Sequence, residues 1–510
     1  MRNKAMRSLI FGIVATCFML ATTANAADDL TKPIRVSPDG HFLVQPDGEP
    51  FFWLGDTGWA IFERLTREET DEYLKDRANK GFTVIQAVAI GGPFDRLDVP
   101  NRYGELALIE KDPTRPNPRY FEHIDWVVNR AAHYGLRIAM LPVWGASVIG
   151  GYLDDGTQKI FNPSNADVYG RWLGTRYRNK GIIWILGGDT NPVGVVATIS
   201  GGKRIKPADL IITDYRPVYD AMAGGIIAGD GRTPFISYHI TCCSWSGTAQ
   251  PRTSLYLGDR TWLTMNMLQS SHSGDPKVSS QWTGVSFVWN GTFNYEPIRD
   301  EYDSIPTRPV VDGEPRYEGI PVGVRYDPAK GYWTAYDARN AAYHALFAGA
   351  AGHTFGNLAV HLSYDPARHS SPQLEEFYPG LKHWREELNS LGAQQMRHVK
   401  ALMLSRPYFT RIPDQSVIVG DADEGTGHIG ATRDKDGSYA MFYLPHAQPI
   451  TVDMSKIAGL HAVAWWFNPR SGAAQRVVGR LPTTGTATFN PPSSGAENDW
   501  VLVVDDESKA

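Results

Sequence analysis

The sequence predicts an α/β protein, a (β/α)8 barrel of the TIM type followed by a smaller antiparallel β-sandwich. Three observations lead to this prediction. From Phe51 onward, short apolar runs alternate with longer amphipathic stretches, which is typical of parallel strands joined by helical crossovers. Eight such runs can be counted, the number that closes a barrel. From about Pro407 the runs become short and alternating, with turn residues between them, which favours an antiparallel sandwich.

The composition is that of a globular protein with enough apolar material for a large core. The chain has 510 residues, of which 42% are hydrophobic and 21% charged. A formal net charge of −5 gives no electrostatic reason to expect nucleic acid or an anionic membrane as a partner. The 15 Trp and 23 Tyr suit stacking against sugar rings, although most tryptophans in proteins pack a core.

Residues 1–26 are expected to be a signal peptide. A basic start with Arg2 and Lys4 precedes an apolar stretch from Leu9 to Ala21, and Ala24-Asn25-Ala26 fits a cleavage site. The alternative is an uncleaved membrane anchor, but the stretch is shorter than the ~20 apolar residues that a membrane span needs. We therefore expect an exported protein, periplasmic or secreted, with no membrane contact after cleavage.

Cysteine usage gives little structural information. Cys17 lies in the signal segment, which leaves the adjacent pair Cys242 and Cys243. A disulfide between two adjacent cysteines cannot crosslink distant parts of the fold, and their spacing does not suggest a zinc site. A vicinal disulfide and two buried thiols are both open interpretations.

The barrel domain is predicted to span residues 27–406. It begins with a hairpin, in which His41–Val44 lies between two Pro-Asp-Gly turns. The eight predicted strands are Phe51–Asp56, Phe82–Ala89, Leu136–Trp144, Ile182–Asp189, Phe235–Ile240, Met265–His272, Pro309–Glu314 and Gly352–Asn357.

Helix boundaries are marked by capping signals. Thr66 and Glu69 form a capping-box pattern that opens a helix to about Lys80, where Gly81 ends it. Asn162-Pro163 opens another. Further helices are predicted at Phe121–Tyr134, Ala338–Ala351 and Gly392–Met403.

Long polar segments follow four of the predicted strands. They are Ile90–Thr114, Gly145–Phe161, Val193–Lys206 and Ser273–Pro306. In a barrel such βα loops build the active-site face. The segment Leu358–Pro379 is a further loop after the last strand.

The second domain is predicted to span residues 407–510. Its expected strands are Ser416–Val419, Ile429–Arg433, Tyr439–Leu444, Ile450–Asp453, Val463–Asn468, Ala487–Asn490 and Trp500–Val504. This number of short strands indicates a sandwich.

Two acidic residues at strand ends are the candidate catalytic groups. Asp189 follows the apolar run Ile182–Leu186 and two glycines, and Glu314 follows a second apolar run, with Asp312 and Glu318 as nearby competitors. Strands four and seven lie on opposite sides of an eight-stranded barrel, so their terminal carboxylates can face each other across its mouth. Glycoside hydrolysis needs such a pair, one as acid and one as nucleophile or base. Alternatively, each acid could cap a helix or form a loop salt bridge.

Other polar and aromatic residues gather at the same predicted face and could bind a sugar. The candidate substrate-binding residues are Asp56, Trp59, Gln86, Trp144, His239, Gln269, His272, Arg316, Tyr317 and His353.

Other chemistries lack a sequence signature. The chain has no His-Glu-x-x-His zinc motif and no Gly-x-Ser-x-Gly elbow. Nothing in it calls for an organic cofactor or a required metal. The alternatives that remain are a non-catalytic carbohydrate- or matrix-binding secreted protein and a peptidase.

The same residues resemble the apiosidase-like family, glycoside hydrolase family 140. The resemblance rests on stretches such as Phe52–Trp59, Gly81–Gln86, Ile182–Pro192, Asp312–Glu318 and, near the C-terminus, Trp465–Arg470. It implies a barrel with a C-terminal domain of the kind labelled collagen-binding. It also implies a retaining mechanism with Asp189 as acid/base and Glu314 as nucleophile. The family's characterised activity is cleavage of apiosyl linkages in the pectic glycan rhamnogalacturonan II. The resemblance therefore implies these linkages as a candidate substrate.

Overall fold

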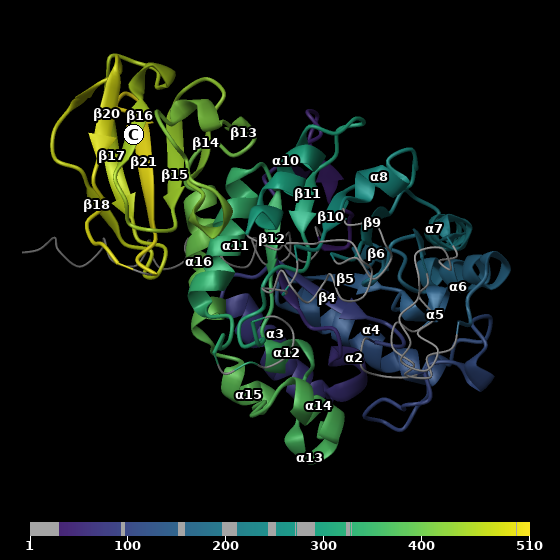
Figure 1. Cartoon of the computed structure of the whole chain (residues 1–510). Coiled ribbons are helices and arrows are strands. Elements are labelled where there is room, and N and C mark those ends of the chain that lie inside the picture. Colours follow the sequence, from purple (N-terminus) through teal and green to yellow (C-terminus); the bar gives the residue numbers. More distant parts are fainter. Residues whose placement is uncertain are drawn as a thin grey trace, which may run out of the picture.

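The computed structural model contains a barrel domain and a β-domain that packs against one side of it (Figure 1). It describes residues 30–92, 97–150, 159–195, 212–242, 251–270, 272, 291–322, 327, 329–495 and 497–510. The predicted signal peptide and most of the Ser273–Pro306 segment lie outside these residues, as does Cys243.

Eight parallel strands form the predicted barrel. Their order in the sheet is β10-β11-β12-β3-β4-β5-β6-β9. Strands β9 and β10 close the circle, because Thr264 N donates to Ile236 O at 2.8 Å and Ser237 Oγ donates to Met265 O at 2.8 Å. The strands are β3 (Trp53–Thr57), β4 (Val84–Val88), β5 (Arg137–Leu141), β6 (Ile183–Gly187), β9 (Phe235–His239), β10 (Asn266–Leu268), β11 (Val310–Asp312) and β12 (Gly352–Phe355).

Strand alternation separates two apolar layers. Side chains that point into the barrel, such as Val84, Ile183 and Val311, form one buried cluster. Their neighbours in the chain, such as Ile85 and Trp184, belong to a larger cluster between the strands and the surrounding helices. Because successive side chains of a strand point to opposite faces, a residue's position in its strand decides whether it faces the barrel interior or a helix.

The helices cover the outside of the barrel, and the two predicted capping signals are confirmed. Thr66 and Glu69 form the capping box of α3, and Asn162 caps α6. The longer helices are α3 (Arg67–Asn79), α4 (Pro118–His133), α6 (Pro163–Arg176), α7 (Arg216–Asp230), α11 (Ala335–Phe347) and α16 (Leu391–Met403). The shorter ones are α2 (Ile61–Arg64), α5 (Ala146–Ile149), α8 (Thr253–Leu257), α10 (Glu296–Tyr302), α12 (Leu358–His361), α13 (Pro366–His369), α14 (Pro372–Phe377) and α15 (Trp384–Glu387).

The C-terminal domain is antiparallel, as predicted. Its main sheet has the order β13-β14-β15-β21-β17-β18, with β19 paired to β17, and the pair β16-β20 packs with it around a common core. Its strands are β13 (Arg411–Pro413), β14 (Gly430–Asp434), β15 (Tyr439–Leu444), β16 (Ile450–Asp453), β17 (His461–Phe467), β18 (Ala474–Arg476), β19 (Leu481–Pro482), β20 (Thr486–Phe489) and β21 (Trp500–Asp506).

Both faces of this main sheet are covered. On β15, Phe442 and Leu444 face the core of the β-domain, whereas Met441 and Tyr443 belong to the large cluster that they share with the barrel helices. Figure 1 shows α11 and α16 between the two domains. The β-domain is therefore joined to the barrel through a continuous apolar core.

Some local predictions are wrong. The segment predicted as the strand Ser416–Val419 is mainly a 3-10 helix over Gln415–Val417, because the Asp414 side chain accepts from Ser416 N and turns the chain there. The predicted loop Ser273–Pro306 contains α10. The short hairpin β1-β2 (Arg35–Val36 with Leu43–Val44) is present as predicted, and β7 (Val193–Val195) pairs antiparallel with β8 (Ile212–Asp214).

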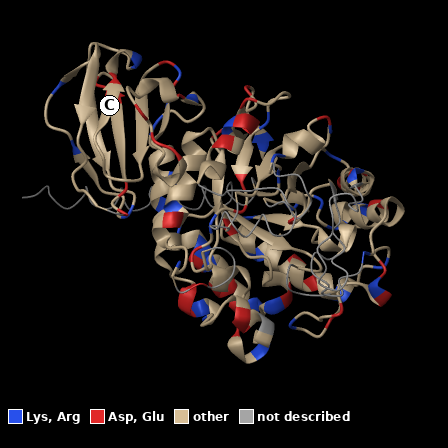
Figure 2. Cartoon of the chain, viewed as in Figure 1, with Lys and Arg blue, Asp and Glu red and all other residues tan. Residues whose placement is uncertain are grey.

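Charged residues of both signs are interspersed over the outer helices and loops, whereas the strands carry few (Figure 2). Within the described part of the chain, no helix has both the length and the apolar character needed to cross a membrane.

Candidate active site

Asp189 stands at the C-terminal end of β6, where the chain makes a turn that requires glycine. Gly187 and Gly188 have φ of 85° and 108°, and a Cβ at Gly188 would lie 2.7 Å from the ring of Trp144. Asp189 itself has φ of 49°. Its backbone N–H donates to His239 Nδ1 at 3.3 Å, and its Oδ1 accepts from Gln269 Nε2 at 2.9 Å. The two glycines thus turn the acid toward the barrel mouth.

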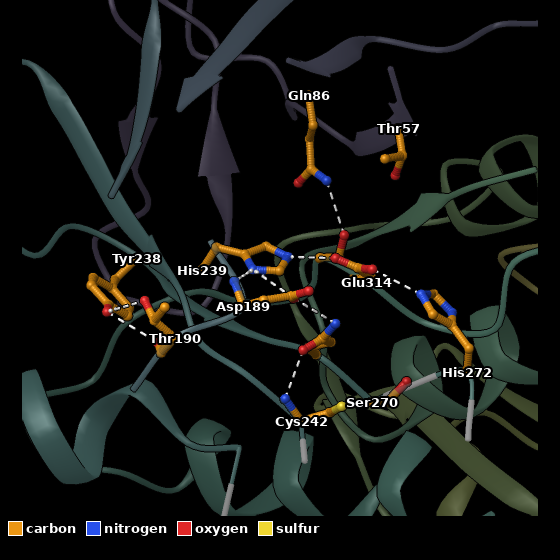
Figure 3. A network of polar contacts seen from close by, with 12 residues as sticks. Thr57, Gln86, Asp189, Thr190, Tyr238, His239, Cys242, Ser270, His272 and Glu314 are labelled. Atoms are coloured by element: carbon orange, nitrogen blue, oxygen red, sulfur yellow. Dashed lines mark hydrogen bonds and ion pairs between the residues drawn. The ribbon is translucent and has the colours of Figure 1, made fainter. Parts of the chain in front are cut away.

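Glu314 follows β11 and is almost fully buried between two histidines (Figure 3). Its Oε1 lies 2.8 Å from His272 Nε2, and its Oε2 lies 3.1 Å from His239 Nε2. Because His239 Nδ1 accepts the Asp189 N–H, the proton of a neutral His239 lies on Nε2, which faces Glu314. His239 therefore contacts both acids and fixes their relative position.

The two carboxylates are close neighbours. One oxygen of Asp189, one ring nitrogen of His239 and one oxygen of Glu314 all lie within 4.8 Å of one another. Such a set could in principle ligate a metal ion. The ring nitrogens of His239 already face the Asp189 N–H and Glu314, so the hydrogen bonding accounts for the cluster without an ion.

The environment gives the two acids opposite proton affinities. Burial and the nearby charge of Glu314 raise the pKa of Asp189 to about 7. Burial alone would also raise the pKa of Glu314, but the hydrogen bonds and positive charge offered by His239 and His272 hold it well below its usual range. Near neutral pH, Glu314 is therefore an anion while Asp189 retains a substantial protonated fraction.

Aromatic rings support this cluster from the barrel interior. Trp59 and Trp144 are buried and lie 5.5 Å and 6.1 Å from the His239 ring, centroid to centroid. Tyr317 lies 4.3 Å from the His272 ring, and its hydroxyl hydrogen-bonds to Thr57 at 2.8 Å. These rings hold the two histidines in place. The two tryptophans are buried beside His239 and do not offer an exposed ring face on which a sugar could stack.

Gln86 also lies on the interior side of its strand. Its Nε2 donates to Gly313 O at 2.9 Å and so supports the peptide that precedes Glu314.

The structure does not bring three of the predicted substrate-binding residues into the cluster. Asp56 points outward from β3 and accepts from Tyr73 Oη at 2.6 Å and Arg77 Nε at 2.7 Å, so it anchors α3. His353 also lies on the outer side of its strand, paired in register with Asp312. Arg316 is buried and donates to Asn294 and Asn340. Sequence alone placed these residues near strand ends but did not decide which face each side chain would occupy.

The two acids that competed with Glu314 have structural partners. Asp312 accepts from Ser270 Oγ at 2.6 Å on the outer side of the barrel. Glu318 accepts from Ser390 Oγ at 2.6 Å and from Gly392 N at 3.1 Å. Both carboxylates hold segments of the fold together.

Three residues near the site were not predicted. Burial, with the charges of Glu314 and Asp189 as smaller causes, raises the pKa of Tyr378 to about 12. Tyr378 directly follows α14, one of three short helices in the segment Leu358–Pro379 that was wrongly predicted as a loop. An aromatic residue in that segment was the available sequence signal. His361 packs 5.3 Å from the Tyr317 ring. Cys242 N donates to Gln269 Oε1 at 2.7 Å, which orients the amide toward Asp189.

Cys242 is disulfide-bonded, so the buried-thiol interpretation is wrong for this residue.

A buried acid pair with opposite proton affinities at the mouth of a (β/α)8 barrel defines the class, a glycoside hydrolase. Solved structures agree. A "Glycoside hydrolase" is 30% identical over 94% of this chain and 98% of that chain, with a TM-score of 0.78. A glycoside hydrolase family 5 structure from Bacteroides vulgatus is 29% identical over 94% of each chain, also with a TM-score of 0.78.

Family models give the more specific assignment. Residues 37–410 match the model described as "Apiosidase-like, catalytic domain", and residues 412–505 match the "Putative collagen-binding domain of a collagenase". The chain therefore belongs to the apiosidase-like family. No curated protein gives a significant match.

Proposed function

We propose that this glycoside hydrolase works with retention of configuration, with Asp189 as the acid/base and Glu314 as the nucleophile. The observation that carries the proposal is the proximity of one oxygen from each carboxylate, within 4.8 Å, combined with their opposite pKa shifts. Retaining enzymes separate their carboxyl groups by about 5–5.5 Å, whereas inverting enzymes need about 6.5–9.5 Å to admit a water molecule.

In the first step, Glu314 attacks the anomeric carbon and Asp189 gives its proton to the departing glycosidic oxygen. The bond to the leaving group breaks as the bond to Glu314 forms, through an oxocarbenium-like transition state. The histidine contacts to Glu314 keep it ionised for attack. The negative charge of the nearby Glu314 helps to keep Asp189 protonated until that step.

In the second step, Asp189 is a carboxylate and takes a proton from water, whose oxygen attacks the anomeric carbon and releases Glu314. The free sugar leaves, and the proton taken from water leaves Asp189 ready for the next cycle. Neutralising Glu314 in the covalent intermediate lowers the pKa of Asp189, because the charge that raised it is gone. The same residue can therefore act first as an acid and then as a base.

The proposed substrates are plant cell-wall or related glycans, with apiosyl linkages of rhamnogalacturonan II as the first to test. Family membership supports this choice. Loops at the barrel mouth set specificity, so the test includes other pectic and arabinan glycans.

The test compares wild type, D189A and E314A on a panel of pectic and arabinan glycans, with NMR of the first-formed sugar. We expect cleavage with retention by wild type, and losses of about 10²–10⁴-fold or more in kcat for both variants. Azide should rescue both variants, giving a glycosyl azide of retained configuration with D189A and of inverted configuration with E314A.

E318Q is the matched control, since it removes an acid that contacts only Ser390 and Gly392 in the described structure. It should keep activity within a few-fold of wild type. Cleavage that survives both D189A and E314A would overturn the assignment. Glycan binding without turnover by wild type would favour the carbohydrate-binding alternative.

We also propose that the protein is exported, periplasmic or secreted, after removal of residues 1–26. The disulfide at Cys242 supports this, because disulfides persist mainly in oxidising compartments. Mass spectrometry of the protein from its native host should give an N-terminus at Ala27, and an intact Met1 would contradict the proposal.

A further inference from the structure

The segment that carries Glu314 is held from its outer side. Asp312 and Arg316 lie two residues before and two residues after Glu314, and both are buried, with 0% and 1% exposure. Asp312 ends β11 and faces away from the barrel interior, where Ser270 Oγ donates to it at 2.6 Å. The position of Glu314 therefore depends on what holds these two flanking residues.

One polar network holds both of them. Asn294 donates from Nδ2 to Ser270 Oγ at 2.7 Å, and its Oδ1 accepts from Arg316 Nη2 at 2.5 Å. Asn294 thus connects the Ser270–Asp312 pair to Arg316. Since Ser270 and Asn294 are both fully buried, water does not compete for these hydrogen bonds.

The network continues into the C-terminal β-domain through Asn340 of α11. Asn340 Oδ1 accepts from Arg316 Nη2 at 2.9 Å, and its Nδ2 donates to Thr426 O at 3.1 Å. Asn340 is fully buried. A single amide side chain therefore joins the buried Arg316 beside Glu314 to a backbone carbonyl of the other domain.

The β-domain segment that carries Thr426 also packs directly on the segment that carries Asn294. A Cβ at Gly291 would lie 2.5 Å from Thr426 N. Tyr295 accepts from Gly425 N at 3.2 Å, and its ring stacks on His428 with centroids 4.1 Å apart. Contacts from the β-domain thus reach the network at two points, Asn340 and the Gly291–Tyr295 segment.

We propose that the C-terminal β-domain is a working part of the active site, in which Asn340 is a positioning residue that couples Thr426 to the segment holding Glu314. The effect on kcat that this proposal predicts rests on the proposed role of Glu314 as nucleophile. The predicted structural effect on the segment that carries Glu314 does not. The domain that a family model describes as collagen-binding thereby supports the nucleophile of the barrel.

The test uses the full chain with N340D and a matched control. In N340D, the carboxylate still accepts from Arg316 but has no N–H to donate to Thr426 O. The control is Y336F, which removes a different interdomain hydrogen bond from the same helix, from Tyr336 Oη to Pro445 O at 3.3 Å. N340S, whose shorter side chain cannot span both partners, replaces N340D if the latter does not fold.

Hydrogen exchange of the peptide covering residues 310–318 is the first measurement. We expect about tenfold faster exchange in N340D than in wild type, with Y336F close to wild type, because only N340D removes the hydrogen bond between this network and Thr426. The second measurement is kinetic. A displaced nucleophile should lower kcat by about 10–100-fold while KM stays within about threefold of wild type.

Exchange of residues 310–318 that is the same in N340D, Y336F and wild type would overturn the proposal. A wild type that hydrolyses no glycan would refute the proposed function instead, and the exchange measurement would still decide this inference.

Discussion

The hydrogen bond from Gln269 to Asp189 should lower the alkaline limit of activity, which in the proposed mechanism is set by the pKa of Asp189. Gln269 Nε2 donates to Asp189 Oδ1 at 2.9 Å, and this contact lowers the pKa of Asp189 against the larger effects of burial and Glu314. Substituting Gln269→Met removes the donor and keeps a side chain of similar length. The carboxylate form loses stabilisation, so the pKa of Asp189 should rise further above its ordinary value.

The size of this shift follows from hydrogen-bond energies. A bond to a charged group contributes about 1.5–3 kcal/mol and one to a neutral group about 0.5–1.5 kcal/mol, so the difference is about 1 kcal/mol, or roughly 0.7 pH units. The side chain of Asp189 is 33% exposed, so solvent should reduce the shift to about half a unit.

The assay is the pH dependence of kcat/KM on a glycoside with a poor leaving group, because such a substrate needs the proton of Asp189. Protonated Asp189 persists to higher pH in Q269M, so the alkaline limb of the kcat/KM profile should move to higher pH. The control is Q86M, which removes an amide that bonds to Gly313 O and so should leave this limb in place. An alkaline limb that stays fixed or moves downward in Q269M would refute the reasoning.

Three further substitutions separate the roles of residues around the pair. H272N removes the 2.8 Å contact to Glu314, so the pKa of Glu314 should rise. The acid limb of the kcat/KM profile should then move to higher pH, and kcat/KM should fall about 10–100-fold. D56N removes the fully buried counter-charge of Arg77, which keeps its ion pair with the partly exposed Asp76, and should cost about 3–5 kcal/mol of stability in urea unfolding. KM should stay within about twofold of wild type, and a large KM increase would restore Asp56 as a substrate contact. W144A should cost about 3–5 kcal/mol in the same unfolding assay and also lower kcat, because a ring beside His239 is lost; an unchanged kcat would show that this ring does not hold His239.

The barrel strands were predictable because each is a short apolar run with a clear end. Ile183–Gly187 and Phe235–His239 lie within the predicted ranges, and the capping signals at Thr66 and Asn162 mark real helix starts. The pairing of Val193–Val195 with Ile212–Asp214 and the helix Arg216–Asp230 were not predicted. The first of these strands lies in the predicted loop Val193–Lys206, and Gly224, Gly225 and Gly229 weaken the helical pattern of the second segment. Local hydrogen bonds, as at Asp414, also override a strand-like pattern.

The candidate site was predictable only to the level of strand ends. Sequence placed Asp189, Glu314, His239 and His272 at the same barrel face, and the structure brings them together. The sequence could not show that Asp56 faces α3. Successive side chains of a strand point to opposite faces, so an error of one residue in the strand position exchanges the inner and outer faces. The contact of Cys242 with Gln269 spans 27 residues of sequence and depends on the backbone path, which no local pattern records.

The surroundings of the two acids support the roles proposed for them. Two carboxylates whose oxygens approach within 4.8 Å in a buried site cannot both be charged without a large cost, so one must be protonated. Both histidines approach Glu314, whereas Asp189 receives an amide N–H from Gln269 and lies 4.0 Å from the His239 ring nitrogen. The anion is therefore most stable on Glu314, and the proton belongs to Asp189. In the proposed mechanism, the histidines thus select the nucleophile by stabilising its charge, and the repulsion that this charge creates keeps the acid protonated near neutral pH.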